Sequence, residues 1–203
     1  MKVNFKESQT KENLMRAFAG ESQARNRYTF AAEVAKKQGY PMIQQTLIFT
    51  ADQEKAHAEV FYNHLKELSG QTIFIDGGYP VDVYDDVITA LKSASHNEYE
   101  EAEDVYINFA EVARQEGFLK VAQDFLNIAK IEKVHGDRFA NLVKGLEDNN
   151  LYNDVQSAKW MCLNCGFIYE GTSVPEKCPV CDHEKGYFIR LNTAPFTTDS
   201  TSK

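Results

Sequence analysis

Apolar and polar residues alternate at helical spacing through most of the first 149 residues, and four amphipathic segments can be distinguished. This part of the chain is rich in Ala, Glu, Lys, Gln and Leu, which favour helices. Glycine and proline mark the segment ends, because they stop helices or begin them. The predicted helices span residues 11–38, 41–68, 85–116 and 118–146.

The connections between these segments differ in length. The first and second segments, and the third and fourth, are joined by short turns, so each pair is expected to pack as antiparallel neighbours. The second and third segments are joined by the long stretch GQTIFIDGGYPVDVY, residues 70–84. Two helical hairpins joined by one long crossover form a ferritin-like four-helix bundle. We therefore predict a mainly α fold of this kind.

The two hairpins repeat each other at an offset of 78 residues. EKAHAEVF begins at Glu54 and EKVHGDRF at Glu132, and EVAKKQGY from Glu33 matches EVARQEGF from Glu111. The same offset also relates Tyr28 to Tyr106. Chance matches among the Ala, Glu and Lys residues common in helices therefore do not explain the similarity. The pattern indicates a duplicated helical hairpin.

The repeated segment carries a Glu-x-x-His pair in each half. A Glu and a His three positions apart project from one face of a helix. A dinuclear iron site in a bundle takes such a pair from two helices and one carboxylate from each of the other two. The candidate ligands are Glu21 on the first helix, Glu54 and His57 on the second, Glu98 and Glu101 on the third, and Glu132 and His135 on the fourth. Carboxylates with imidazoles suit iron or manganese better than copper.

The repeat slips by one residue in the third segment. Seven positions separate Glu21 from Tyr28, but eight separate Glu98 from Tyr106. One extra residue inside a helix is often absorbed as a π-bulge at a functional site, so we predict such a bulge between Glu98 and Tyr106. The two tyrosines either donate to ligand carboxylates or serve as core aromatics. The unmatched histidines, which are expected to pack or lie at the surface, are His64, His96 and His183.

The chain changes character after Leu146, where a polar stretch leads into a segment rich in Cys, Gly and Pro. Two Cys-x-x-Cys pairs, separated by twelve residues, predict a tetrahedral four-thiolate site. Four thiolates hold zinc or iron, and the spacing does not choose between them. The ligands would be Cys162, Cys165, Cys178 and Cys181. Their clustering favours a local metal site in a reducing compartment over disulfides.

These patterns divide the chain into a bundle over residues 1–148, a linker over 149–158 and a small β-rich domain over 159–203, with a loose tail from residue 192. The formal charge of −8 and pI near 5.2 disfavour nucleic acid and anionic membranes as partners. No apolar run could span a bilayer, and the N-terminus lacks the apolar stretch of a signal peptide. We expect a cytoplasmic protein.

The chain resembles the rubrerythrin family, in which a ferritin-like di-iron domain precedes a rubredoxin-like domain. The resemblance covers residues 11–191 and rests on AGESQARNRY, DQEKAH, NEYEEAEDVY, IEKVH and the cysteine pairs. It implies that Glu54 and Glu132 bridge a non-haem, oxo/carboxylate-bridged di-iron centre. Glu21 and Glu101 would be terminal ligands of one iron, and Glu98 and His135 of the other. On reduction, the first iron would exchange Glu101 for His57.

The resemblance also implies an activity, which is the reduction of hydrogen peroxide to water as an oxidative-stress defence in an anaerobe or microaerophile. Electrons would come from NAD(P)H through a separate reductase and a rubredoxin-type carrier. They would reach the di-iron centre through one iron held by the four cysteines. A homodimer is expected.

Three alternatives remain open from the residues alone. Ferritin-like bundles also oxidise and store iron, although storage needs a cage that an appended module would hinder. The cysteine module could hold zinc and dock a partner protein. An oxygenase acting on an organic substrate is also compatible with the scaffold, although no feature of the sequence points to a substrate pocket.

Overall fold

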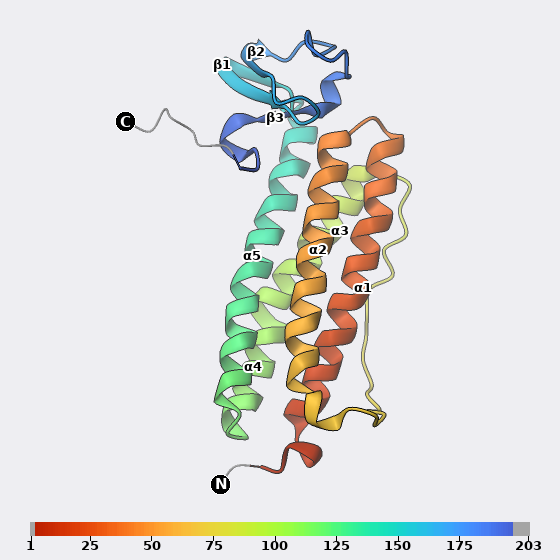
Figure 1. Ribbon diagram of the computed structural model, residues 1–203, viewed down its shortest axis with the longest axis vertical. Coiled ribbons are helices and arrows are strands. Elements are labelled where there is room, and N and C mark those ends of the chain that lie inside the picture. Colours follow the sequence, from red (N-terminus) through yellow and green to blue (C-terminus); the bar gives the residue numbers. More distant parts are fainter. Residues whose placement is uncertain (1–2, 197–203) are drawn as a thin grey trace, which may run out of the picture.

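The computed structural model describes residues 3–196, which form a long helical bundle with a small sheet at one end (Figure 1). The helices are α1 (Gln9–Lys37), α2 (Pro41–His64), α3 (Val87–Glu100), α4 (Tyr106–Gln115) and α5 (Leu119–Glu147). Short 3₁₀ turns occur at Phe5–Glu7, Lys66–Leu68, Lys185–Tyr187 and Leu191–Thr193. The third predicted helix is thus divided into α3 and α4.

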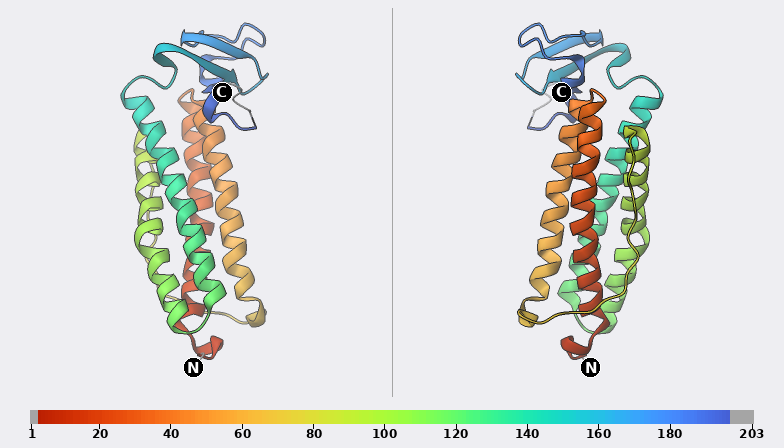
Figure 2. Two further views of the ribbon diagram at one scale, coloured as in Figure 1. Left: turned by 90° about the vertical axis from the view of Figure 1, so that its left-hand side faces the viewer. Right: turned by 90° about the vertical axis from the view of Figure 1, so that its right-hand side faces the viewer.

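The helices pack as two hairpins, with α1 against α2 and with α3 and α4 against α5. The connection from α2 to α3 runs along the outside of the bundle, as the yellow trace in Figure 2 shows. The expected ferritin-like four-helix bundle with a long crossover is therefore confirmed. Two ion pairs attach the crossover to α1, one from Arg16 to Asp76 and one from Arg27 to Asp82, each at 2.5 Å.

The two hairpin turns have the same construction, in keeping with the sequence repeat. Gly39 and Gly117 both adopt a left-handed backbone conformation, with φ of 80° and 87°. The next residue of each turn donates its N–H back to the helix, from Tyr40 to Ala35 at 2.9 Å and from Phe118 to Ala113 at 2.8 Å. A glycine meets the need for positive φ at such helix ends without strain.

The predicted π-bulge is confirmed. Residues Glu101–Val105 form a π-helical segment between α3 and α4. The wider turn absorbs the extra residue, so that Tyr106 returns to the inner face that Tyr28 occupies in α1. Both tyrosines are almost completely buried.

The apolar interior of the bundle consists of two clusters with a polar layer between them. One cluster, near the α4–α5 turn, includes Leu14, Phe61 and Phe125. The other, near the small sheet, includes Ile43, Leu91 and Phe139. Along each helix, the predicted ligands fall between the two clusters. Packing on both sides therefore fixes the positions of these side chains.

The C-terminal part contains a three-stranded antiparallel sheet in the order β2–β1–β3. The strands are β1 (Asn153–Cys162), β2 (Ile168–Ser173) and β3 (Phe188–Arg190). Buried Trp160 and Phe188 form its core with two of the cysteines. The expected small β-rich unit is confirmed, while the domain boundaries stay predictions. Of the predicted tail, residues 197–203 lie outside the described residues.

The small sheet rests on the α1–α2 turn through Gly186. A Cβ atom at this position would lie 2.5 Å from the backbone oxygen of Gly39 and 2.6 Å from Cδ of Pro41. Only a residue without a side chain permits so close an approach. Among residues 3–196, no helix is long and apolar enough to cross a membrane.

Candidate metal centres

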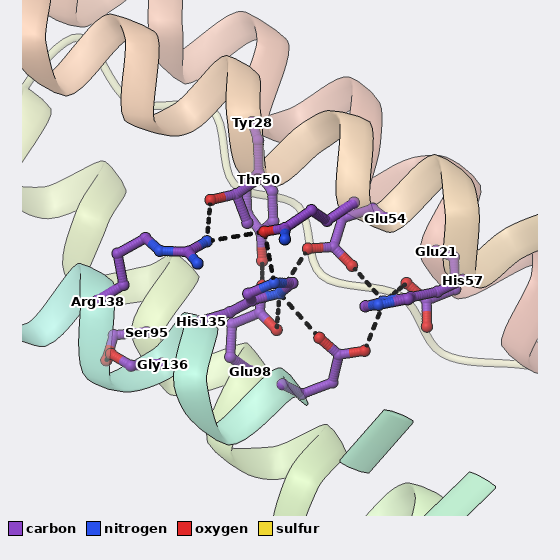
Figure 3. Close-up of polar contacts among 12 residues, drawn as sticks. Glu21, Tyr28, Thr50, Glu54, His57, Ser95, Glu98, His135, Gly136 and Arg138 are labelled. Atoms are coloured by element: carbon purple, nitrogen blue, oxygen red, sulfur yellow. Dashed lines mark hydrogen bonds and ion pairs between the residues drawn. The ribbon is translucent and has the colours of Figure 1, made fainter. Parts of the chain in front are cut away.

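A layer of acidic and imidazole side chains lies in the middle of the bundle, cut off from water. Glu21, Glu54, Glu98, Glu132 and His135 are at most 1% exposed, and His57 is 6% exposed. They come from α1, α2, α3 and α5, as Figure 3 shows for the labelled residues. Four ionisable carboxyls in so small a space would be strongly destabilising without compensating positive charge.

The first half of this layer is centred on His57. Its Nδ1 lies 2.9 Å from Oε1 of Glu132 and 3.2 Å from Oε2 of Glu54. Oε2 of Glu21 is 3.7 Å away. Ligand atoms of these four residues lie within 4.8 Å of one another, which is close enough for one metal ion.

The second half is centred on His135 and has nearly the same geometry. Its Nδ1 lies 2.9 Å from Oε1 of Glu54 and 2.9 Å from Oε2 of Glu132. Oε2 of Glu98 is 3.7 Å away. Glu54 and Glu132 thus belong to both groups and present one oxygen to each. Two carboxylates shared in this way are suited to bridge a pair of metal ions.

Two buried tyrosines hold the unshared carboxylates. The hydroxyl of Tyr106 donates to Oε1 of Glu21 at 2.5 Å, and that of Tyr28 donates to Oε1 of Glu98. Each tyrosine therefore donates to a carboxylate on the other helical hairpin. Both also pack in the apolar clusters, so the two roles expected from sequence coincide. Burial raises the pKa of both phenols well above the ordinary value, so each remains a donor.

The protonation of the layer reflects competition between burial and mutual attraction. Burial lowers the pKa of His135, but the neighbouring carboxylates of Glu132, Glu54 and Glu98 outweigh this effect and raise the pKa to about 11. Burial opposes ionisation of Glu54, but the neighbouring histidines, His135 and His57, lower its pKa to about 2.

The unshared carboxyls shift in the opposite direction. Burial and the charge of Glu54 raise the pKa of Glu98 to about 8. Burial and the charge of Glu132 raise the pKa of Glu21 well above its ordinary value. Without a metal, the layer therefore holds extra protons.

The donor atoms fit a pair of metal ions. Several buried atoms that face the centre make no hydrogen bond of regular geometry among the described residues, although they lie in ion-pair contact with other atoms of the layer. They are Glu21 Oε2, Glu54 Oε1, Glu98 Oε2, both oxygens of Glu132, and His135 Nδ1. Unpaired buried acceptors of this kind are destabilising unless a cation occupies the space between them. The set of carboxylate oxygens and one imidazole per metal suits iron.

Glu101 is the one predicted carboxylate that joins neither group. It lies in the π-helical segment and lines a cavity of about 240 Å³ between that segment, α1 and the crossover. Gly20, Tyr79 and Tyr106 are among the other lining residues. Burial, together with the charge of Glu98, raises the pKa of Glu101 well above its ordinary value.

The four cysteines converge at the edge of the small sheet. The Sγ atoms of Cys162 and Cys181 are 3.8 Å apart, and those of Cys165 and Cys178 are 3.6 Å apart. A tetrahedron with metal–sulfur bonds of about 2.3 Å has edges of about 3.8 Å. The spacing therefore fits a single tetrahedral metal ion, and the predicted four-cysteine site is present.

Backbone amides support these thiolates in both knuckles. The N–H of His183 lowers the pKa of Cys181 to about 6. The N–H of Phe167 also lowers the pKa of Cys165, but burial and the three neighbouring cysteines outweigh it and raise that pKa to about 12. Gly166 and Asp182, which directly follow the second cysteine of each pair, both have positive φ. This tight turn directs the following amide towards the sulfur.

The side chains of the remaining histidines belong to neither group of candidate ligands. His64 Nε2 is 2.8 Å from Asp124 Oδ2 and links α2 to α5, while His96 is exposed on α3. The ring of His183 packs edge-on against Tyr187. Three polar residues beside His135 were not predicted from the sequence, and they are Thr50, Gln53 and Arg138. The sequence offered one signal for them, which is that Thr50 and Arg138 each lie within one helical turn of a Glu-x-x-His pair.

Comparisons with known proteins agree with this geometry. A family model described as Rubrerythrin matches residues 12–143, and one described as Rubrerythrin, rubredoxin-like domain matches residues 160–189. The rubrerythrin of Clostridium perfringens is 44% identical over 91% of this chain and 95% of its own. That of Nitratidesulfovibrio vulgaris is 38% identical over 93% and 97%. Among solved structures, fully reduced, all-ferrous nigerythrin is similar with a TM-score of 0.61 and 29% identity, covering 91% of this chain and 90% of that one.

Proposed function

The chain belongs to the rubrerythrin family, and from this membership and the geometry of its two centres we propose that it reduces hydrogen peroxide to water. The observation that supports this most directly is the combination of two sites in one chain. Carboxylates and histidines grouped closely enough for two metal ions lie in the bundle, and a four-thiolate site lies in the appended module.

The reaction consumes two electrons and two protons for each peroxide, and its product is two molecules of water. A pair of ferrous ions held by the bundle would supply both electrons, one from each ion. Glu54 and Glu132 would hold the pair together, because each presents one oxygen to either half. Glu21 with His57, and Glu98 with His135, would complete the two halves.

The remaining residues prepare the centre for a small polar substrate. Tyr28 and Tyr106 fix the unshared carboxylates, and the apolar clusters above and below exclude bulk water. The cavity of about 240 Å³ beside Glu101, whose lining includes Tyr106, is the proposed entry for peroxide. Hydrogen peroxide is small enough for such an entry, whereas the cavity offers little room for a large organic substrate.

We further propose that His57 and Glu101 exchange at one metal position. In the present arrangement, His57 joins Glu21 while Glu101 lies beside the cavity. A neutral imidazole suits a ferrous ion, and a carboxylate offsets the higher charge of a ferric ion. The His57 arrangement therefore corresponds to the state that the family resemblance assigns to reduction.

The four-cysteine site is proposed to hold iron and to return electrons to the bundle one at a time. In this scheme, a rubredoxin or a rubredoxin reductase supplies these electrons, which derive from NAD(P)H. The functional unit is a homodimer in the cytoplasm, and the role is defence of an anaerobe or microaerophile against oxidative stress. A four-thiolate iron is a one-electron carrier, whereas zinc would be redox-inactive.

A stoichiometric titration tests the proposal. The protein is loaded with ferrous iron under argon, reduced, and mixed with increasing amounts of hydrogen peroxide while its visible spectrum is recorded. We expect the bands of ferric thiolate to appear as peroxide is consumed. A colourless protein would indicate zinc in the cysteine site, and a spectrum unchanged by peroxide would contradict the proposed activity. Light scattering on the same sample distinguishes the expected dimer from a storage cage.

A further inference from the structure

The two histidines of the bundle differ in what lies behind them. Nε2 of His135 contacts Oε1 of Gln53 at 3.1 Å. The same oxygen accepts a hydrogen bond from Nη1 of Arg138, also at 3.1 Å. In His57, all polar contacts with the described residues are made by Nδ1. Its Nε2 has no hydrogen-bond partner among them.

The hydrogen bonds around Gln53 determine which nitrogen of His135 carries a proton. Arginine is always a donor, so Gln53 must present its amide oxygen to Arg138 rather than its amide nitrogen. That oxygen can only accept, so Nε2 of His135 must donate to it. When His135 is neutral, Nδ1 therefore has the free lone pair and faces Glu54, Glu98 and Glu132.

Arg138 is itself held in place. Its Nη1 donates to Oγ1 of Thr50 at 2.8 Å, and its guanidinium lies 5.4 Å from the centre of the Phe49 ring. Thr50 is fully buried and donates its own hydroxyl proton to the backbone oxygen of Thr46. Arg138 and Thr50 are drawn beside His135 in Figure 3.

The internal repeat lacks this arrangement in its other half. At the offset of 78 residues that relates His57 to His135, Gln53 corresponds to Ile131. Arg138 corresponds to Val60, and Thr50 corresponds to Ile128. All three polar residues are therefore replaced by aliphatic ones, although the ligands themselves are repeated.

We propose that Gln53, oriented by Arg138 and Thr50, is a positioning residue that keeps His135 a permanent metal ligand, and that the lack of a counterpart leaves His57 free to move. A partner on the distal nitrogen fixes the ring orientation of a ligating histidine and increases its basicity. The second part rests on the proposed exchange of His57 for Glu101. The first part concerns metal binding alone and does not depend on peroxide chemistry.

The test uses the full chain loaded with Zn²⁺, which is diamagnetic and has no redox activity. Nuclear magnetic resonance of the protein with ¹⁵N-labelled histidine identifies the protonated nitrogen of each ring and its rate of exchange with water. In the unaltered protein, we expect His135 to carry its proton on Nε2 and to exchange it at least tenfold more slowly than His57. Equal exchange rates would overturn the proposal.

Two substitutions at Gln53 separate positioning from packing. Gln53→Leu keeps the size but removes the acceptor, so His135 should exchange as fast as His57. Its Zn²⁺ affinity should also fall about 10- to 100-fold in competition titrations. Gln53→Glu retains an acceptor and should keep exchange slow. The matched control is Ile131→Leu at the equivalent position of the other half, which should change neither histidine.

A second variant guards against misfolding of the first. Arg138→Met keeps an unbranched side chain beside Phe49 but removes the donors that orient Gln53. We expect faster exchange at His135 with the bundle still helical by circular dichroism. If His135 stays slow in both Gln53→Leu and Arg138→Met while both proteins are folded, the assignment of Gln53 is wrong. If the NMR results are as expected but the protein does not reduce peroxide, the proposed function is contradicted and the assignment of Gln53 is not.

Discussion

Removing metal from the bundle should make its stability fall as pH rises from 6 to 8. In the metal-free protein, burial and the charge of Glu54 raise the pKa of Glu98 to about 8, from an ordinary value of about 4.5. The folded protein therefore keeps a proton that the unfolded chain releases. The contribution of Glu98 to the free energy of unfolding is greatest below pH 4.5, where both states are protonated, and decreases until the folded carboxyl ionises near pH 8.

The size of this effect follows from the shift. Each pH unit in which the folded state holds one extra proton changes the free energy of unfolding by about 1.4 kcal/mol. Glu98 alone then removes about 5 kcal/mol between pH 4.5 and 8, of which about 3 kcal/mol falls between pH 6 and 8. His135, with a pKa raised to about 11, acts in the same direction. Its contribution is complete below about pH 6.5 and is lost as pH rises towards 11.

Bound metal should remove this dependence, because Glu98 is then deprotonated in both the folded and the unfolded protein. Ligands bind metal in their deprotonated form, so metal affinity increases with pH. The stability difference between the loaded and the metal-free protein should therefore widen between pH 6 and 8. We expect it to grow by at least about 3 kcal/mol at saturating metal, from the Glu98 proton alone.

Urea unfolding followed by helical circular dichroism measures both forms. One series contains a chelator, and the other contains ferrous iron under argon, each at pH 6 and at pH 8. Glu98→Gln is the matched control, because a neutral amide replaces the titrating group. Its metal-free form should lose about 3 kcal/mol less than the unaltered protein over this interval. Equal stability of the metal-free protein at both pH values would refute the reasoning.

Three further predictions concern the site and the module. His57→Ala should slow peroxide turnover at least tenfold while His96→Ala, on the exposed face of α3, leaves it unchanged; equal rates in stopped-flow assays would contradict the ligand exchange. Gly186→Val should separate the small sheet from the α1–α2 turn and increase protease cleavage between α5 and β1. Gly78→Val is the control, because nothing lies within 4 Å of a Cβ atom added there, and it should not increase cleavage. Tyr106→Phe leaves Glu21 without its donor and should weaken metal binding in that half by about 1–3 kcal/mol, measured by competition titration; unaltered affinity would argue against a supporting role.

Much of the fold follows from local pattern. Amphipathic spacing and the glycines at the turns predicted the helical hairpins, and both turns adopt the positive φ that only glycine takes without strain. The π-helical segment was predicted from one extra residue between Glu98 and Tyr106, because a slip inside a duplicated helix has few structural solutions.

That these carboxylates and histidines gather in the bundle could also be predicted, since a repeated Glu-x-x-His pair is specific and each pair must face inward; their role as ligands stays a prediction. The way in which these side chains are arranged in this structure could not be predicted from the sequence. Whether Glu101 or His57 joins Glu21 depends on the rotamers of side chains that can both reach the centre, and the sequence carries no signal for that choice. The hydrogen bonds from Arg138 through Gln53 connect different helices, so no periodicity within one helix reveals them.

The central claim is that acidic side chains buried in the bundle are tolerated because two metal ions lie between them. Anomalous X-ray scattering at the iron edge, from crystals of the chain loaded anaerobically with ferrous iron, tests this directly. We predict two iron peaks inside the bundle, each within bonding distance of Glu54 and Glu132, and a third among the four cysteines. A bundle without iron peaks, with those carboxylates turned outward into water, would contradict the account.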